Sequence, residues 1–338
     1  MAKQYTGRER VKAAFNREYA DRVPVATMVG AHCAELAGVT LEEYVTDFEK
    51  ALKVAKVAQE LFPSDLVSVP GNPLLADVQA IRRGLKGESP VQHRLADKSA
   101  IATLKVRPPQ EDRFFGPLLK MCEKTAAAFP NEAVRTMVGG PWTVAVELRG
   151  TEQLIYDTVD DPDFVHKVMR FTTELTKHRA VAVAQAGVDP MIADPSAGCS
   201  VISPAIYRQW VKPYHEEIFS YLREKGVMRF IHICGNVEPI MVDLLSLPLE
   251  AISIDGPTPL KKMVETSQKK VVIMGNLETS LFVEATKEQM EAAVKNCIDI
   301  AAKGSAYILA PGCAIPLNAT HDRIRYFMDA AIKYGRHN

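Results

Sequence analysis

Short runs of apolar and β-branched residues recur along the chain, and each run ends in a turn rich in glycine, proline or polar residues. Amphipathic stretches with helical spacing separate these runs, which is the pattern of repeated strand and helix units. The candidate strands read VPVATMVG, LVSVPGN, VRTMVGGPWT, PMIADPSA, RFIHICGN, AISIDG, VVIMGN and YILAPGC. Eight such units predict an α/β fold, a TIM (β/α)8 barrel with parallel strands inside and helices outside.

An open, doubly wound parallel sheet is the alternative arrangement of such units. Sheets of that type bind dinucleotides through a glycine-rich fingerprint after the first strand, and none follows VPVATMVG. The barrel is therefore the preferred interpretation. Because such barrels run as one unit of about 200 to over 400 residues, we expect residues 1–338 to form a single barrel domain.

Several helices can be placed from their caps and periodicity. Residues 161–187 begin at an acidic cap and end at a glycine, and residues 286–304 begin at a threonine and also end at a glycine. Residues 1–20 are basic and then amphipathic, so we expect an N-terminal helical extension. Residues 76–120 are the least regular part, and we interpret them as an excursion from the barrel.

Charge and composition narrow the classes of function. Lysine plus arginine equals aspartate plus glutamate at 41 each, so no net field favours nucleic acid or an anionic membrane. No apolar stretch approaches the length of a membrane span, and no signal core follows the N-terminus. The six cysteines are scattered without disulfide-scaffold spacing. We expect a cytoplasmic protein with reduced cysteines; a homodimer is compatible with the sequence, which does not determine the oligomeric state.

Polar residues follow the apolar runs at the predicted carboxyl ends of the strands. Active sites of such barrels lie at that end, so these positions are the candidates for function. They include Asp194, Ser196, Asn236, Asp255 and Asn276. Asp194 and Asp255 suit a general base or a residue that orients a metal ligand, although an aspartate at a strand end also commonly caps a turn.

His232 and Cys234 stand one residue apart at the end of an apolar run. Side chains of a strand alternate between its faces, so both point to the same side, in phase with Phe230. Cys313 follows another strand and is expected at the same mouth. One nitrogen and two sulfurs suit zinc at about 2.0 to 2.3 Å, with the fourth position open. The alternative is that these are packed or hydrogen-bonded core residues, as we expect for Cys122 and Cys297.

Motifs spread over nearly the whole chain resemble the uroporphyrinogen decarboxylase superfamily, and within it the cobalamin-dependent methyltransferases. The stretches are REYADRVPV, GGPWTVAVEL at 139–148, DPSAGCSVISPAIYRQWVKPY at 194–214, HICGN at 232–236, GNLET at 275–279 and APGCAIPLNAT at 310–320. The resemblance independently implies a TIM barrel.

Two departures from the decarboxylases favour the methyltransferase branch. The decarboxylases carry an arginine-rich segment after the first strand, whereas this chain has no arginine between Arg22 and Arg82. A substrate with many carboxylates would find little to bind there. The decarboxylase GHGIP pattern near the C-terminus is replaced by Gly312-Cys313-Ala314-Ile315-Pro316, so a histidine has become a zinc-type ligand.

The resemblance implies zinc held by His232, Cys234 and Cys313. It also implies a corrinoid supplied by a separate protein, because the corrinoid-binding DxHxxG motif is not matched: the HxxG from His232 to Gly235 has Phe230 in place of the aspartate. The implied activity is a zinc-dependent transfer of a methyl group between a corrinoid (cobalamin) protein and a small substrate. That substrate is a thiol such as coenzyme M, or a methyl donor such as an aryl methyl ether.

We assign expected roles on this basis. Asp194, Asp255 and Asn236 are the candidate catalytic residues, and Ser196 and Asn276 are expected to orient ligands or substrate. Two alternatives stay open: a decarboxylase of the same fold that needs no metal, and a non-catalytic module that binds a corrinoid protein and uses zinc for structure alone. The sequence does not identify the methyl donor or acceptor, the direction of transfer or the fourth zinc ligand.

Overall fold

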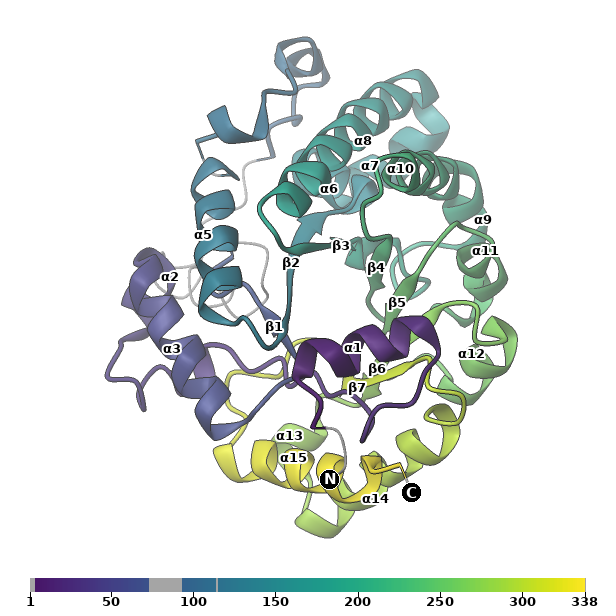
Figure 1. The fold of residues 1–338 in the computed structure, drawn as a ribbon. Helices are drawn as coiled ribbons and strands as arrows, with labels where there is room; N and C mark the ends of the chain where they lie inside the picture. Colours follow the sequence, from purple (N-terminus) through teal and green to yellow (C-terminus); the bar gives the residue numbers. More distant parts are fainter. Residues whose placement is uncertain (1–3, 73–92, 114, 338) are drawn as a thin grey trace.

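The computed structural model describes residues 4–72, 93–113 and 115–337. Their central element is one sheet of seven parallel strands in the order β1 to β7, so each strand pairs with its neighbours in the sequence. The strands are β1 Leu66–Ser68, β2 Ala133–Gly139, β3 Asp189–Ala193, β4 Phe230–Ile233, β5 Ala251–Ile254, β6 Val272–Leu277 and β7 Tyr307–Pro311. Figure 1 shows the strands curled together inside a ring of helices.

The predicted first strand, VPVATMVG at residues 23–30, does not form a strand. It makes a single parallel bridge, from Val25 to Leu309 of β7. Pro24 has no N–H to extend a ladder, and Met28 turns the chain with a φ of 53°. The segment still fills the gap between the sheet edges: Ala26 N–H donates to Leu309 O at 2.9 Å, and Asp65 N–H donates to Val25 O at 2.8 Å. The prediction of eight strands is therefore corrected to seven, curled into an incomplete barrel of the TIM type.

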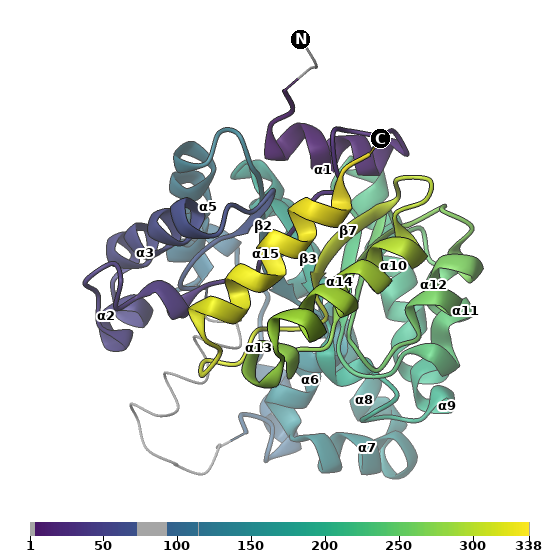
Figure 2. The same cartoon turned by 90° about the horizontal axis from the view of Figure 1, so that it is seen from below.

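Helices follow the strands and cover the outside of the sheet (Figures 1 and 2). The larger ones are α1 Gly7–Asn16, α2 Leu41–Thr46, α3 Phe48–Leu61, α5 Phe115–Ala128, α6 Pro141–Arg149, α7 Thr151–Asp160, α8 Pro162–Gln185, α10 Lys212–Glu224, α11 Met241–Leu245, α12 Leu260–Ser267, α14 Lys287–Ala301 and α15 His321–Gly335. Shorter ones are α9 Pro204–Ile206 and α13 Leu281–Glu284. Figure 2 places α1 at one end of the strands and α7 at the other.

The helices predicted from caps and periodicity are confirmed. Asp161 caps α8 by accepting a hydrogen bond from Phe164 N–H, and Thr286 forms a capping box with Gln289 at the start of α14. Helix α1 lies within the residues predicted as an N-terminal helical extension. Of the predicted excursion, residues 76–92 and 114 lie outside the described residues, and the rest contains short 3-10 turns and the start of α5. No helix among the described residues is long and apolar enough to cross a bilayer.

The strands alternate between two apolar layers. Phe230 packs inside the barrel with side chains such as Met191 and Met274. Ile231 and Ile233 face the opposite way and pack in the larger core between the sheet and the helices. His232 is in phase with Phe230, so the pleat directs it into the barrel interior, close to the carboxyl end of β4.

Candidate metal centre and cavity

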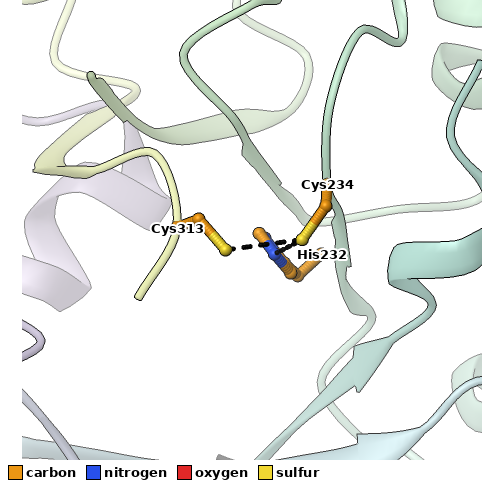
Figure 3. Close-up of side chains that lie close together, drawn as sticks. All are labelled: His232, Cys234 and Cys313. Carbon is orange, nitrogen blue, oxygen red and sulfur yellow. Dashed lines mark hydrogen bonds between the residues drawn. The ribbon is translucent and has the colours of Figure 1, made fainter. Parts of the chain in front are cut away.

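Three side chains with nitrogen and sulfur donors converge at the carboxyl ends of β4 and β7. His232 lies on β4, Cys234 follows that strand directly, and Cys313 follows β7. His232 Nε2 lies 3.2 Å from Cys234 Sγ, and Cys234 Sγ lies 3.4 Å from Cys313 Sγ. All three donor atoms lie within 4.8 Å of one another, so one metal ion can contact them together. Figure 3 shows the side chains pointing toward one another from two separate segments.

The neighbouring strand orients the imidazole. His232 pairs in register with Ser253 of β5, and His232 Nδ1 lies 3.0 Å from Ser253 Oγ. When Nδ1 carries the proton, it donates to this hydroxyl and leaves the lone pair of Nε2 directed at the sulfurs. A hydrogen bond of this kind to the second ring nitrogen is what fixes the tautomer of metal-binding histidines.

The pKa values of the Cys234 and Cys313 thiols are shifted in opposite directions. A hydrogen bond from the Cys234 thiol, together with a smaller effect of His232, lowers the pKa of Cys313. The same interaction, with desolvation, raises the pKa of Cys234. The interaction therefore favours a thiolate at Cys313 while Cys234 keeps its proton, at a place that is partly exposed to solvent. Soft sulfur and borderline nitrogen donors around such a charge fit a zinc ion.

Backbone contacts hold the loops that carry the ligands. Gly235 has a φ of 71°, and its N–H donates to Asp255 Oδ2 at 2.8 Å. Asp255 Oδ1 accepts from Gly256 N–H at 2.8 Å. On the other side, Gly198 lies so close to Cys234 that a Cβ atom there would overlap the Cys234 carbonyl oxygen. The turn after β4 is therefore clamped between the tips of β3 and β5.

A cavity of about 350 Å³ opens beside the three ligands. Its walls come from the segment after residue 26, from α2 and α3, from β1 and β2, and from α6. The apolar side chains are Met28, Val29, Tyr44, Ala55, Ala58, Phe62, Leu66, Val67, Pro70, Met137, Ala193, Pro195 and Ala314. The side chains of His232, Cys234 and Cys313 form part of the same wall, so a molecule in the cavity can reach a metal held by them.

Of the other predicted site residues, Ser196 lies on the cavity wall, where its N–H donates to Thr143 Oγ1 at 3.1 Å. Asn236 stabilises its own turn, because its Oδ1 accepts from Glu238 N–H at 2.9 Å. The Nδ2 of Asn276 donates to Thr258 O at 2.7 Å, which ties β6 to the turn after β5. Neither asparagine lines the cavity.

Asp194 is fully buried and does not line the cavity. Its Oδ1 accepts from Thr143 N–H at 2.6 Å at the start of α6, and its Oδ2 lies 2.8 Å from His215 Nε2. His215 is itself fully buried, and its Nδ1 lies 3.2 Å from the hydroxyl of Tyr207. These contacts anchor the first turn of α6 to β3 and α10.

Sequence reasoning missed the polar side chains of α6 and α3 in the cavity. Thr143 and Glu147 stand four residues apart, so they share a face of α6, and that face lines the cavity. Their spacing in GGPWTVAVEL, directly after a predicted strand, was an available signal. Gln59 of α3 also lines the cavity, but no local pattern marks it, because α3 belongs to a part of the wall that only the fold brings close.

Together these features define a parallel-stranded α/β protein with a candidate His-Cys-Cys metal centre at the mouth of its barrel. The sequence profile of the uroporphyrinogen decarboxylase (URO-D) family matches residues 6–334. The chain belongs to this family.

Curated relatives extend over nearly the full length. The chain is 24% identical to "Methylcobamide:CoM methyltransferase MtbA" of Methanosarcina mazei, with 98% of this chain and 99% of that protein covered. It is 24% identical, with the same coverage, to "Methylcobamide:CoM methyltransferase MtaA" of Methanosarcina barkeri. It is 23% identical to the uroporphyrinogen decarboxylase of Campylobacter fetus, with 86% of this chain and 90% of that protein covered.

A solved structure supports the fold. A "methyltransferase from Methanosarcina mazei" superposes with a TM-score of 0.85 at 23% identity, covering 98% of this chain and 99% of that one. At this identity the likeness establishes the arrangement of strands and helices. It is the geometry of this chain's own ligands that carries the argument on chemistry.

Proposed function

We propose that this protein is a zinc-dependent methyltransferase that moves a methyl group between a separate corrinoid protein and a small substrate bound in the cavity. The observation that carries the proposal is the convergence of His232, Cys234 and Cys313 on one point of the cavity wall. The names of the full-length relatives, methylcobamide:CoM methyltransferases, support the same class of reaction. A thiol is the favoured acceptor.

Different residues of the site would bind the metal and orient its ligands. His232, Cys234 and Cys313 would hold zinc, and Ser253 keeps the imidazole turned toward it. Bound zinc supplies the positive charge that keeps an incoming thiol deprotonated and nucleophilic at neutral pH. Two thiolate ligands offset that charge and leave the substrate sulfur electron-rich. This balance suits activation of a thiol better than strong polarisation of a leaving group.

The overall reaction balances without a further reactant. A bond forms between the substrate sulfur and the methyl carbon while the carbon–cobalt bond of the partner's corrinoid breaks. The electron pair of the broken bond stays with cobalt, and the thiol proton passes to solvent. The largely apolar cavity walls would hold the substrate beside the three metal ligands.

Demethylation of an aryl methyl ether is the second candidate, with transfer in the opposite direction. The apolar lining favours it, because Met28, Phe62 and Met137 offer a surface suited to an aromatic ring. The choice between the two candidates rests on which compound binds and on the direction in which the corrinoid is converted.

Roles for the remaining predicted residues are part of the proposal. Ser196 would contact a molecule in the cavity, whereas Asn276 would brace the tip of β6 near Asp255. Asp255 and Asn236 would act beside the metal by holding the turn that carries Cys234. For Asp194 we propose a positioning role through α6, since the cavity is lined by Thr143 and not by the carboxylate itself.

The test compares metal content with turnover in matched variants. Purified protein is expected to contain stoichiometric zinc, and both His232→Ala and Cys313→Ala should lose the metal together with methyl transfer to or from a corrinoid protein. Cys199→Ala is the control, because this cysteine lies outside the cluster of donors. The spectrum of the corrinoid protein reports the change in cobalt state.

Each rival activity gives a different result in this experiment. A protein that holds no zinc and decarboxylates uroporphyrinogen would be a decarboxylase. A zinc protein that captures a corrinoid protein and turns nothing over would be a binding module. Either result would overturn the proposed function.

A further inference from the structure

We propose that the substrate of this cavity is an uncharged molecule with an apolar body, of the size of a substituted aromatic ring, and that it bears no sulfonate or carboxylate. This inference rests on the proposed function and names the substrate class of the same site. A protein with this preference would act on a different class of substrate from an enzyme whose thiol substrate carries a strong acid group.

The first support is the composition of the wall that faces the metal centre. Met28, Phe62, Val67 and Met137 form an apolar surface on segments that the fold brings together from residues 28 to 137. A cavity of about 350 Å³ lies in the usual range for small-molecule sites, in which apolar contact supplies most of the affinity. A sulfonate placed against such a surface would lose its hydration without compensation.

The second support is the sign of the charge in the cavity. Among the described residues that line it, apart from the three metal ligands, Glu147 carries the one charged side chain. The surrounding protein desolvates this carboxyl group and raises its pKa. When ionised it repels an anionic substrate, and when protonated it donates a hydrogen bond to a neutral oxygen. Neither form provides the cation that a sulfonate requires.

The arginine that acts on Glu147 is bound to other residues. Arg179 of α8 influences Glu147 electrostatically, but its guanidinium is bound to Asp112 at 3.1 Å and stacks over the ring of Phe115. Arg179 does not line the cavity. Among the described residues, the other polar side chains that line the cavity, apart from Glu147 and the three metal ligands, are neutral: Thr27, Gln59, Ser64, Ser68, Thr143 and Ser196. These suit an ether, hydroxyl or carbonyl oxygen on a neutral molecule.

The experiment measures binding to the zinc-loaded protein by calorimetry, with pairs of compounds that differ by one sulfonate group. Benzenethiol is compared with 4-mercaptobenzenesulfonate, and methoxybenzene with 4-methoxybenzenesulfonate. We expect the compound without the sulfonate to bind at least about tenfold more tightly than its sulfonated partner in at least one pair. 2-Mercaptoethanesulfonate, which has the sulfonate and no ring, is expected to bind most weakly.

Substitutions of Glu147 connect the preference to the cavity. Glu147→Gln should reduce the difference in affinity between the two compounds of a pair. Glu147→Lys should reverse the order of their affinities, because the lysine supplies a cation for the sulfonate. Glu152→Lys makes the same change of charge at an exposed position of the adjacent α7, outside the cavity, and should leave the preference unchanged. Zinc content and circular dichroism verify that each variant is folded and loaded.

Equal or tighter binding of the sulfonated compounds to the wild-type protein would overturn the inference, as would the same response to both lysine variants. Its failure differs from failure of the proposed function. Selective binding of neutral compounds without any change in a corrinoid protein would remove the methyltransferase assignment alone. Methyl transfer to 2-mercaptoethanesulfonate in preference to benzenethiol would remove the substrate class alone.

Discussion

The Sγ atom of Cys313 lies 3.4 Å from the Sγ atom of Cys234, although 79 residues separate them in the chain. The strands that carry them, β4 and β7, are separated by β5 and β6 in the sheet. In a flat sheet three strand spacings would place their ends roughly 14 Å apart. The curvature of the sheet brings these two strand ends together. The metal centre therefore depends on the curvature of the barrel as well as on the chemistry of the ligand side chains.

The hydrogen bond between His232 and Ser253 should contribute to metal affinity. Ser253→Ala removes the group that fixes the imidazole tautomer, and we expect zinc affinity to fall about 10- to 100-fold. Competition with a chromophoric chelator measures this. Ser246→Ala, at an exposed position at the end of α11, is the control and should leave affinity unchanged. An unaltered affinity in the Ser253 variant would mean that packing alone orients the histidine.

The close approach of Gly198 to Cys234 should also matter for the metal. Gly198→Ala places a methyl group against the Cys234 carbonyl oxygen, so the turn after β4 must shift. We expect weaker zinc binding and a loss of about 1–3 kcal/mol in the free energy of unfolding. Gly335→Ala, whose added carbon would lie 3.5 Å from Val23 Cβ, should show neither effect. Full zinc affinity in the Gly198 variant would contradict the proposed clamp.

Substitutions of Asp194 distinguish a catalytic role of this carboxylate from a positioning role. Asp194→Ala leaves His215 and the N-terminus of α6 without their buried acceptor, so urea unfolding should reveal a loss of about 3–5 kcal/mol. Asp194→Asn keeps one acceptor oxygen and should lose less stability. If the asparagine variant were as stable as wild type and held zinc but transferred no methyl group, the catalytic role predicted from the sequence would stand.

Asp189, at the start of β3, gives a pH dependence of stability. Burial, with a smaller effect of Glu250, raises the pKa of Asp189 to about 6, above the value of about 3.9 expected when unfolded. The folded state thus binds this proton more tightly than the unfolded state does. The stabilisation that comes from the protonated Asp189 carboxyl group is full below about pH 4 and is lost as the pH rises through about 6.

Asp189→Asn should therefore be more stable than wild type at pH 7.5, by on the order of 1–2 kcal/mol. Near pH 4 the two proteins should have equal free energies of unfolding. Chemical denaturation at both pH values measures the difference, and Asp329→Asn on the exposed face of α15 is the control. A variant that is no more stable at pH 7.5 would show that the carboxylate is better solvated than its position implies.

Local pattern was enough to predict most of the fold. Seven of the runs form strands, because alternating or continuous apolar sequence between turn residues leaves few other arrangements. The caps of α8 at Asp161 and of α14 at Thr286 could also be predicted from the sequence, because a cap is a local contact between residues three positions apart. The failure at residues 23–30 is a tertiary effect: that segment fills the gap in the barrel through one bridge to Leu309 and a backbone hydrogen bond with Asp65, without a ladder of its own.

The candidate site divides along the same line. The sequence by itself determined which donors stand at strand ends, because period-two alternation puts His232 and Cys234 on one face and every parallel strand delivers its tip to the same edge. Only the tertiary structure decided that Asp194 is buried beneath α6, that Ser253 orients the imidazole, and that α3 and α6 supply the cavity wall. Those relations join segments far apart in the chain, and their distances follow from how the sheet curls and how the helices pack against it.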